Sequence, residues 1–454
     1  MKKSVHLNRL LIANRGEIAV RIIRACHEMG IEAVAVYSTA DRDSLHVRLA
    51  DKAICIGPPP SAKSYLDCNN LVMAAINSEC EAIHPGAGFL SESASFAKFV
   101  RDRGLIFIGP DPEVIELLGD KVIARDTARR FTLPVTPGTK EAVGDSQKAL
   151  EAVREIGLPV IIKAAAGGGG KGMRIVRREE DLAENLSIAG REAEANFADG
   201  RVFIERYLEN PRHVELQIVA DGGGTVAVLG ERDCTVQKHH QKLIEESPSP
   251  AVNDDMRRRM SEGASAMFRE LKYRGAGTIE FLVEKDKFYF MEVNARVQVE
   301  HPVSEFVSGV DIIRQQILAC TEGKLDKELE KFNGKSSGKN LRGHAIECRI
   351  NALSPGKISR LEIPGGPGVR FDSFMYQGCT VPPYYDSMVA KLIVHSTDRE
   401  AAIARMIRAL NELCIEGIKT NINQQRWIMQ SDVFKSGDFA TSWYETIAKE
   451  AEHE

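Results

Sequence analysis

Polar and apolar side chains alternate most regularly between Glu292 and Glu300. Every even-numbered position in this stretch is polar, and every odd-numbered position is Val or Ala. A period of two residues predicts a β-strand with two unlike faces. A wet edge strand would show the same alternation. The run Phe-Tyr-Phe-Met at 288–291 indicates buried surroundings, however, and therefore favours a functional polar face.

The stretch before this alternation predicts a hairpin. A short Lys-Asp-Lys link separates two apolar runs, which would bring Glu280 alongside Glu292 and Asn294. Three hard oxygen donors would then converge, as Mg²⁺ prefers when it also holds phosphate oxygens. Beyond the hairpin, Arg296 offers a planar fork for an anion and Glu300 offers a carboxylate that could act as a base.

The N-terminal pattern predicts a parallel sheet. Residues 9–13 and 33–37 are expected strands, and between them 14–17 should form a turn and 18–29 a helix. Further strands of the same unit are expected at 82–84 and 105–110, with a boundary near Pro112. No GxGxxG motif follows the first strand, so dinucleotide binding is not supported.

A glycine-rich hairpin is predicted in a second unit, after a helix over 113–131. Strands at 158–163 and 173–176 flank four consecutive glycines and Lys171. Gly172 stands where a Walker loop needs Ser or Thr, which rules out that motif. Such a loop could fold its amides over a triphosphate and close as a lid. A plain flexible hairpin is the alternative, but Lys163 and the downstream carboxylates favour phosphate binding.

The remaining chain predicts antiparallel strands followed by helices. The polar segment 231–242 could be surface or part of the site. A linker is expected over 321–340, and a third unit opens near Arg342. The expected elements are strands at 213–220 and 225–229 and helices at 253–271, 310–320, 401–413 and 424–429.

Composition narrows the class of protein. The 454 residues are 43% hydrophobic and 27% charged, with a formal net charge of −4 and no basic run, so nucleic-acid binding is not expected. The nine cysteines are never spaced as CxxC, which argues against a disulfide framework or structural zinc. Neither a signal peptide nor a membrane span is expected, and we predict a cytoplasmic protein.

Taken together, the motifs resemble those of biotin carboxylases, members of the ATP-grasp superfamily. The resemblance runs from about Leu10 to the C-terminal helices, and its motifs occur in the family order. They lie at 12–18, 84–92, 119–121, 163–173, 231–234, 240–242, 292–302 and 347–349.

The resemblance implies an α/β and α+β multidomain fold. Its expected parts are a Rossmann-like pre-ATP-grasp domain over 1–115, an ATP-grasp core over 116–325 and a C-terminal biotin carboxylase domain over 340–448. The glycine-rich lid would occupy about 135–207. A homodimer is the family expectation.

The resemblance also implies ligands: ATP, two Mg²⁺ or Mn²⁺ ions, bicarbonate and biotin. By motif match, the residues around ATP would be Lys121, Lys163, Gly169, Gly170, Glu205, Arg206, Tyr207, Leu208, His213, Gln237, His240 and Leu282. The metal ligands would be Glu280, Glu292 and Asn294. The substrates would contact Lys242, Arg296, Gln298, Val299 and Arg349.

By the same match, Glu300 would be the base and Lys242 and Arg296 the anion holders. Bicarbonate is a poor nucleophile, so a base must remove its proton while cations hold it in line with the γ-phosphate. Arg349 would stabilise negative charge on the oxygen of biotin. An ion pair with Glu347, two residues away on the same strand face, is the alternative for Arg349, and both roles can hold.

Three positions differ from the family pattern. Ala87 stands where a tyrosine usually lies near biotin, the connection over 350–357 is shorter than usual, and Ala166 replaces a glycine of some members. No Met-Lys-Met biotinylation site occurs and no length remains for a carboxyltransferase. We therefore expect biotin on a separate carrier protein and the carboxyltransferase on another subunit.

The expected activity is the first half-reaction of an acetyl-CoA carboxylase, as in fatty acid biosynthesis, or of a related enzyme. Propionyl-CoA, pyruvate and 2-oxoglutarate also remain open as acceptors. Another ATP-grasp ligase, such as a carbamoyl-phosphate or purine-pathway enzyme, is a second interpretation, although the motifs around Arg296 and Arg349 oppose it. A nucleotide-binding subunit without catalytic activity is a third, favoured only by Ala87 and the short connection.

Overall fold

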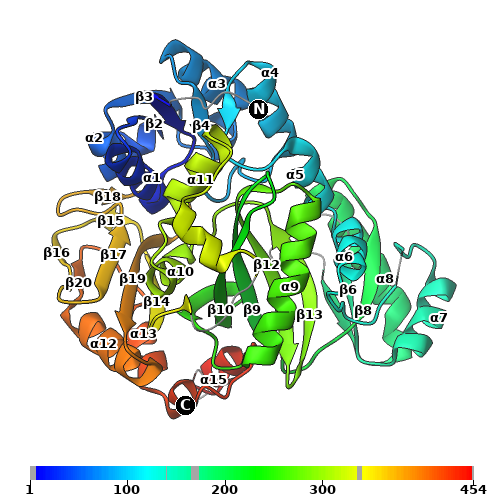
Figure 1. Cartoon of the computed structure of the whole chain (residues 1–454). Helices are drawn as coiled ribbons and strands as arrows, with labels where there is room; N and C mark the ends of the chain where they lie inside the picture. The colour runs from blue at the N-terminus through cyan, green and yellow to red at the C-terminus, as the bar shows by residue number, and fades with distance from the viewer. Residues whose placement is uncertain (1–6, 140, 165–172, 335–339, 452–454) are drawn as a thin grey trace.

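A five-stranded parallel sheet forms the N-terminal part of the protein. The computed structural model describes residues 7–139, 141–164, 173–334 and 340–451. The sheet has the order β3-β2-β1-β4-β5, which confirms the predicted β-α-β start. It lies in the blue to cyan part of the chain in Figure 1. Its strands are β1 (Arg9–Ile12), β2 (Glu32–Ser38), β3 (Lys52–Gly57), β4 (Ala82–His84) and β5 (Ile106–Phe107), and its helices are α1 (Gly16–Glu28), α2 (Leu45–Leu49), α3 (Cys68–Asn77) and α4 (Ala94–Asp102).

Two predicted helix boundaries were wrong. The first helix begins at Gly16, within the predicted turn, because the glycine takes a positive φ of 68° that directs the chain into the helix. The predicted single helix over 113–131 is two helices, α5 (Pro112–Gly119) and α6 (Lys121–Arg130). Asp120 is extended, and its carboxylate accepts from two N–H groups of α6, which starts a new helix there.

An eight-stranded sheet holds the centre of the molecule together, in the order β13-β12-β9-β10-β11-β14-β19-β17. Its neighbouring strands are all antiparallel. They are β9 (Arg212–Asp221), β10 (Val226–Lys238), β11 (Gln241–Ser247), β12 (Arg274–Glu284), β13 (Lys287–Asn294), β14 (His344–Asn351), β17 (Val369–Ser373) and β19 (Met388–Ser396). Because β11 pairs with β14, the sheet continues from the central part into the C-terminal part, across the predicted linker.

Helices cover both faces of this sheet. The side chains of Val214, Leu216 and Ile218 pack with those of α9 (Asp254–Glu270). Val219, on the opposite face, packs with α11 (Ile312–Thr321). Successive strand residues point to opposite faces, so the apolar residues of β9 serve two layers at once. The other helices are α10 (His301–Ser308), α12 (Arg399–Glu412), α13 (Ile422–Gln430), α14 (Asp432–Ser436) and α15 (Trp443–Ala451).

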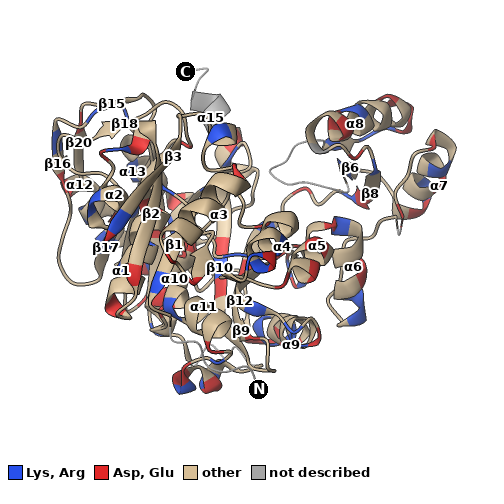
Figure 2. Cartoon of the chain, turned by 90° about the horizontal axis from the view of Figure 1, so that it is seen from above, with Lys and Arg blue, Asp and Glu red and all other residues tan. Residues whose placement is uncertain are grey.

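A small unit with its own apolar core stands apart from the rest (Figure 2). It consists of α7 (Ser146–Ile156), β6 (Val160–Ala164), β7 (Arg174–Val176), α8 (Leu182–Phe197) and β8 (Val202–Arg206). The antiparallel pairing of β6 with β7 confirms the two strands predicted to flank the glycine loop. The loop itself, including Gly169, Gly170, Ala166 and Lys171, lies outside the described residues.

Two interpretations of polar segments change with the structure. The regular alternation does not continue as a strand to Glu300, because β13 ends at Asn294 and the next residues form bends and turns. The polar stretch after Gly230 is not surface at its start, because Glu231, Arg232 and Asp233 are buried in β10. Both segments contribute side chains to the site described below.

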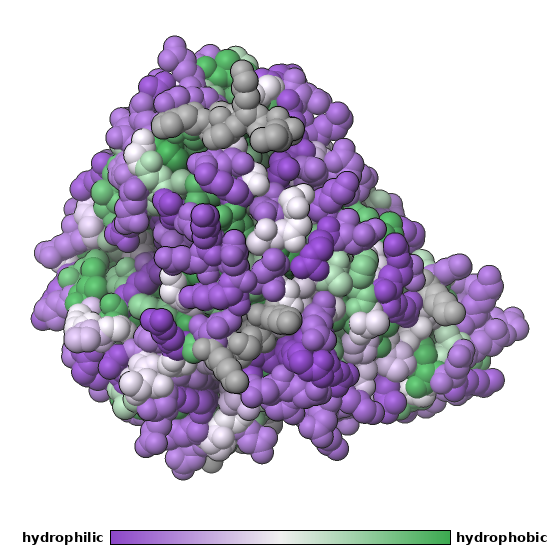
Figure 3. Space-filling view, viewed as in Figure 1, coloured by the Kyte–Doolittle hydropathy of each residue, from purple (hydrophilic) through white to green (hydrophobic). Residues whose placement is uncertain are grey.

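The viewed face of the protein is mainly hydrophilic, with hydrophobic residues between charged and polar ones (Figure 3). Among the described helices, none is long and apolar enough to cross a membrane. Short pairs complete the strands: β15 (Gly356–Lys357) with β18 (Thr380–Val381), and β16 (Arg360–Glu362) with β20 (Cys414–Glu416).

Candidate active site

Three oxygen donors share one face of the β12–β13 hairpin, as the alternation predicted. Glu280 and Glu292 are direct partners in the antiparallel register, and Asn294 lies opposite Thr278. Asn294 Nδ2 donates to Glu280 Oε1 at 2.8 Å. The register shifts directly after Glu280, a bulge of the kind that re-aims side chains beside active sites. This set of hard oxygen ligands could hold Mg²⁺.

One ammonium group fills the space between three buried carboxylates. Lys242 Nζ lies 2.7 Å from Glu215 Oε2, 3.2 Å from Glu280 Oε1 and 2.6 Å from Glu300 Oε1. Glu215 and Glu300 are fully buried, and Lys242 keeps a small exposed fraction. Lys242 and Glu300 are therefore in direct contact. A cation beside a carboxylate could hold an anion and remove a proton from it.

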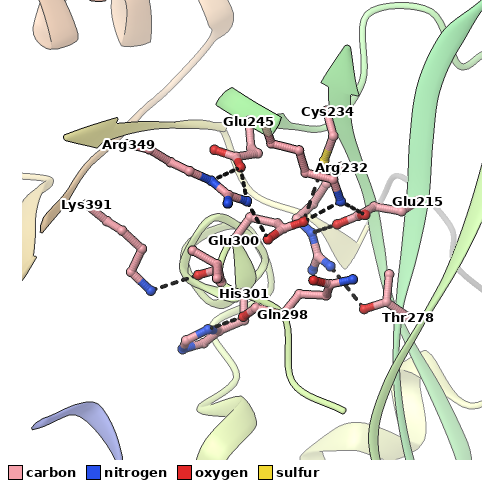
Figure 4. A network of polar contacts seen from close by, with 12 residues as sticks. Glu215, Arg232, Cys234, Glu245, Thr278, Gln298, Glu300, His301, Arg349 and Lys391 are labelled. Carbon is pink, nitrogen blue, oxygen red and sulfur yellow. Dashed lines mark hydrogen bonds and ion pairs between the residues drawn. The ribbon is translucent and has the colours of Figure 1, made fainter. Parts of the chain in front are cut away.

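Arg349 forms a bridge between two carboxylates from other parts of the chain. Its Nε donates to Glu245 Oε1 at 2.6 Å, and a terminal nitrogen donates to Glu300 Oε2 at 2.9 Å (Figure 4). The alternative ion pair with Glu347 is wrong, because neither oxygen of Glu347 has a hydrogen-bond partner among the described residues. The guanidinium reaches across the sheet to β11 instead of along its own strand.

Arg296 is held in place by four oxygen acceptors, one of which is the Val297 carbonyl at 3.3 Å. Its Nε donates to Glu92 at 2.7 Å, and its two terminal nitrogens donate to Gln298 Oε1 and Asn294 Oδ1, both at 2.9 Å. Glu92 belongs to the N-terminal part, so this arginine joins two parts of the protein. Its position next to the oxygen donors suits it to hold an anion beside a metal ion.

Each of the two lysines predicted to bind nucleotide contacts a carboxylate, Lys121 that of Glu292 and Lys163 that of Glu205. Lys121, the first residue of α6, has its Nζ 3.3 Å from Glu292 Oε2. Lys163 on β6 donates to Glu205 Oε2 at 2.7 Å. Arg125 also contacts Glu205. Of the other predicted contacts, Arg206, Tyr207 and Leu208 follow Glu205 at the end of β8.

His213 and Gln237 are hydrogen-bonded to the network around Glu280, whereas no described contact joins His240 to it. His213 Nε2 lies 2.8 Å from Glu280 Oε2, and Gln237 Nε2 lies 2.8 Å from His213 Nδ1. Burial alone would lower the pKa of His213, but the Glu280 carboxylate raises it above its usual value. His240 is exposed in the turn between β10 and β11. Leu282 is partly buried and pairs with His213 across the sheet.

Sequence reasoning missed Glu215, Arg232 and Glu245. Arg232 has no solvent exposure, and its Nε donates to Glu215 at 2.6 Å. One terminal nitrogen donates to Gln217 Oε1 at 2.5 Å and to Ser304 Oγ at 2.9 Å. The other donates to Thr278 Oγ1 at 3.2 Å. A signal was present, because polar residues alternate with apolar ones along β9 at 213, 215 and 217. Only His213 of this strand was predicted to belong to the site.

Burial and neighbouring cations act in opposite directions on the carboxylates around Arg349, and their balance differs between Glu300 and Glu245. Burial alone would raise the pKa of Glu300, but Lys242, Arg349 and Arg232 outweigh it and hold that pKa well below its ordinary range. The pKa of Glu245 rises to about 7, since burial outweighs the attraction of Arg349. Glu300 is thus ionised at neutral pH, held in that form by the surrounding cations.

Comparison with known proteins agrees with this geometry. Residues 6–115 match the family described as "Biotin carboxylase, N-terminal domain", residues 120–328 match "Carbamoyl-phosphate synthase L chain, ATP binding domain", and residues 347–446 match "Biotin carboxylase C-terminal domain". The biotin carboxylase of Allochromatium vinosum is 50% identical over 442 residues, which cover 96% of this chain and 97% of that protein. That of Nostoc is 49% identical over 451 residues, covering 97% and 99%.

Solved structures show the same fold. The biotin carboxylase–β,γ-ATP complex from Campylobacter jejuni superposes with a TM-score of 0.92 at 44% identity, covering 97% of this chain and 99% of that one. The biotin carboxylase domain of the 2-oxoglutarate carboxylase from Hydrogenobacter thermophilus gives a TM-score of 0.91 at 41% identity, covering 97% and 98%.

The fold and the carboxylate hairpin define an ATP-grasp ligase. The model that matches the central part is named after carbamoyl-phosphate synthase, but the models that match both flanking parts are specific to biotin carboxylase. The chain belongs to the biotin carboxylase family, and its activity is the ATP-dependent carboxylation of biotin.

Proposed function

We propose that Glu300, Lys242, Arg296 and Arg349 carry out the chemistry by which bicarbonate, ATP and biotin give carboxybiotin, ADP and phosphate. The observation that carries this assignment is the position of the Glu300 carboxylate, which lies between Lys242 and Arg349. A carboxylate beside two cations can take a proton from a bound anion while the cations hold that anion.

In the first step, Glu300 removes the proton of bicarbonate while Lys242 and Arg296 hold its oxygens. One bicarbonate oxygen attacks the γ-phosphorus of ATP, the bond to ADP breaks, and carboxyphosphate forms. Bound bicarbonate shares the positive charge of Lys242 with Glu300. Because a weaker attraction raises the pKa of a carboxylate, Glu300 becomes a stronger base when its substrate is present. Gln298 and Val299 would line the same anion site.

The hairpin donors Glu280, Glu292 and Asn294 would hold Mg²⁺ or Mn²⁺, which neutralises phosphate oxygens. Lys121 and Lys163 would then turn from their carboxylates towards phosphate. The Campylobacter jejuni relative is described with β,γ-ATP, and the Hydrogenobacter thermophilus domain with MgADP and bicarbonate. These ligands support the same assignment in this chain.

Arg349 acts in the second step, in which carboxyphosphate breaks down and delivers carbon dioxide beside biotin. The phosphate released together with carbon dioxide takes the proton of the ureido nitrogen, which attacks carbon dioxide only when it is deprotonated. Deprotonation places negative charge on the ureido oxygen. Arg349 stabilises that charge as an oxyanion hole does. Its two carboxylate partners hold the guanidinium at the edge of the anion site.

Biotin should arrive on a separate carrier protein, with transfer to the acceptor on a carboxyltransferase subunit. We favour acetyl-CoA as acceptor, with pyruvate and 2-oxoglutarate as alternatives, since relatives include domains of both latter carboxylases. A homodimer is proposed because the Hydrogenobacter thermophilus domain is described as a dimer. All nine cysteines are free, which favours a reducing, cytoplasmic location.

The experiment measures ADP release by the purified protein with Mg²⁺, ATP and bicarbonate, with and without free biotin. Stimulation by biotin supports the proposal and shows that Ala87 and the short connection over 350–357 leave the biotin site usable. If ATP binds but biotin has no effect, the assay is repeated with a biotinylated carrier protein. A second negative result would favour a nucleotide-binding subunit without catalytic activity.

A further inference from the structure

Two fully buried side chains outside the proposed catalytic set bind the backbone next to Glu300. Lys391 Nζ donates to the carbonyl oxygen of Val299 at 2.7 Å. His301 Nδ1 lies 2.8 Å from the carbonyl oxygen of Gln298. Figure 4 shows Lys391 reaching towards this segment and His301 beside Gln298. Two consecutive carbonyls therefore each accept a hydrogen bond from a buried side chain, and the Gln298 carbonyl also accepts one from the His301 N–H at 3.3 Å.

Fixing a carbonyl also fixes the N–H group of the same peptide. The peptides that join Gln298 to Val299 and Val299 to Glu300 are trans, so in each the C=O and the N–H point in opposite directions. With both carbonyls turned to Lys391 and His301, the N–H groups of Val299 and Glu300 turn away from them. Within the described ranges, neither N–H donates a hydrogen bond to the protein. Successive free N–H groups form a concave site for an anion.

His301 is suited to a purely structural donor role. A carbonyl can only accept, so Nδ1 must carry the hydrogen in this contact. Burial lowers the pKa of His301 to about 3, which keeps the ring neutral. Its Nε2 has no hydrogen-bond partner among the described side chains and backbone groups. The contact with Gln298 is therefore the hydrogen bond that sets the orientation of the ring.

Lys391 connects three parts of the protein at this point. It projects from β19 in the C-terminal part, and its Nζ lies 3.0 Å from the carboxylate of Glu17 at the start of α1. Its other partner, the Val299 carbonyl, belongs to the segment between β13 and α10. A buried ammonium needs compensating charge, and Glu17 is its ion-pair partner while the nearby carboxylates of Glu347 and Asp372 also raise the pKa of Lys391. Loss of Lys391 would free the Val299 carbonyl and leave Glu17 buried without a partner.

We propose that Lys391 and His301 are positioning residues that aim the N–H groups of Val299 and Glu300 at the bicarbonate held by Lys242 and Arg296. This inference rests on the proposed function, which places bicarbonate at that point. Neither residue touches the reacting atoms. Each acts through one backbone peptide, and its effect should therefore fall on bicarbonate binding and not on the nucleotide.

The test compares Michaelis constants in the biotin-dependent ADP-release assay. His301→Leu removes one donor, and the double variant Glu17→Gln/Lys391→Met removes the other together with its buried counter-charge. Each should raise KM for bicarbonate roughly tenfold or more, the effect of losing one hydrogen bond to a charged group. KM for ATP should stay within about twofold, since the hairpin donors are untouched.

Two variants separate positioning from folding. In His301→Asn, the amide nitrogen takes about the place of Nδ1, so KM for bicarbonate should return close to the wild-type value. Lys391→Met alone should lower the thermal unfolding midpoint further than the double variant, because it leaves Glu17 buried and unpaired. Every variant is checked for a cooperative unfolding transition before the Michaelis constants are compared.

The outcomes distinguish this inference from the proposed function. Folded His301→Leu and double variants with unchanged KM for bicarbonate would overturn the positioning role and leave the proposed function intact. A KM for bicarbonate as high in His301→Asn as in His301→Leu would remove the donor role of the histidine. Wild-type protein without bicarbonate-dependent ADP release would overturn the proposed function, and this inference with it.

Discussion

Lys242 Nζ lies 2.6 Å from Glu300 Oε1, although the two residues are 58 positions apart in the chain. Lys242 follows the turn between β10 and β11, and Glu300 precedes α10. Glu300 is completely buried. Without Lys242 and its other cationic neighbours, burial would favour the neutral acid form of Glu300. The contact therefore keeps the proposed base ionised, and it is the first relationship to test.

Lys242→Met should raise the pKa of Glu300, because the variant removes its nearest cation. The acid limb of the pH profile for kcat/KM of bicarbonate should move to higher pH, and turnover at pH 7 should fall roughly 100-fold or more. Lys238→Met is the control, since Lys238 is exposed at the end of β10 and should tolerate the same change. An unshifted acid limb in folded Lys242→Met would contradict the assignment.

Arg349→Ala should largely abolish biotin-dependent turnover, by roughly 100-fold or more, because it removes the group proposed to stabilise charge on the ureido oxygen. ATP affinity should change little, since Arg349 lies on β14 and contacts Glu245 and Glu300 rather than the hairpin donors. Stopped assays of ADP with and without biotin measure the effect. Arg360→Ala, at an exposed arginine of the same part, is the control. A near-normal rate in Arg349→Ala would remove this residue from the mechanism.

Glu300→Gln keeps the shape of the side chain and removes its ability to accept a proton. Bicarbonate-dependent ATP hydrolysis and biotin carboxylation should both fall roughly 100-fold or more. Both reactions need carboxyphosphate, and Glu300 is the base proposed for its formation. Equilibrium binding of ATP measures whether the nucleotide site is intact and should remain near the wild-type value. Normal bicarbonate-dependent hydrolysis in this variant would assign the base elsewhere.

Glu292→Gln should weaken the metal site, because it replaces an anionic oxygen ligand with a neutral one. The Mg²⁺ concentration for half-maximal activity should rise roughly tenfold, as expected for about 1.4 kcal/mol of lost binding. Glu284→Gln changes the same residue type on the same hairpin, where its register partner is Lys287, and should leave the Mg²⁺ requirement unchanged. Equal Mg²⁺ curves for wild type and Glu292→Gln would place the metal at other ligands.

Glu246 should make stability depend on pH below about 4.5. Burial would raise its pKa, but hydrogen bonds from His344 and Arg399 hold it at about 2. A folded-state pKa below the ordinary value of 4.5 means that the contribution is fully present above that pH and is lost as pH falls towards 2. It amounts to about 3 kcal/mol at neutral pH.

Urea denaturation of wild type and Glu246→Gln at several pH values tests this linkage. The variant should unfold at a lower urea concentration at pH 7, and the gap between the two midpoints should narrow as the pH falls towards 3. Glu362→Gln, at an exposed carboxylate, should give no such gap at any pH. A constant gap for Glu246→Gln would mean that its effect does not come from ionisation.

The local sequence pattern was sufficient to predict the β12–β13 hairpin, which carries the proposed metal ligands. Glu280 and Glu292 lie opposite each other because a short hairpin turn joins two strands whose side chains alternate with a period of two residues. Both features depend only on residues close together in the chain. The parallel N-terminal sheet and the strands around the glycine loop were predicted for the same reason. The break at Asp120 was missed, although the side-chain cap that causes it is also a local signal.

Contacts between residues far apart in the chain could not be predicted from the pattern of polar and apolar residues. The alternation continues past Asn294, yet the strand ends there and Arg296 binds Glu92 from the N-terminal part. Arg349 binds Glu245 because β14 lies beside β11, a pairing between segments about 100 residues apart. Glu347, the alternative partner considered for Arg349, is nearer in sequence but has no hydrogen bond to it among the described residues.

The sequence by itself determined which residue types this protein offers to a metal, an anion and a phosphate, and which of them share a strand face, because those properties depend on near neighbours. Only the tertiary structure decided that Lys242 neutralises Glu300, that Arg349 joins two carboxylates, and that Lys391 holds the Val299 carbonyl. Each of these contacts joins elements distant in the chain, and their partners are selected by sheet order and by the cost of burying a charge without a counter-charge.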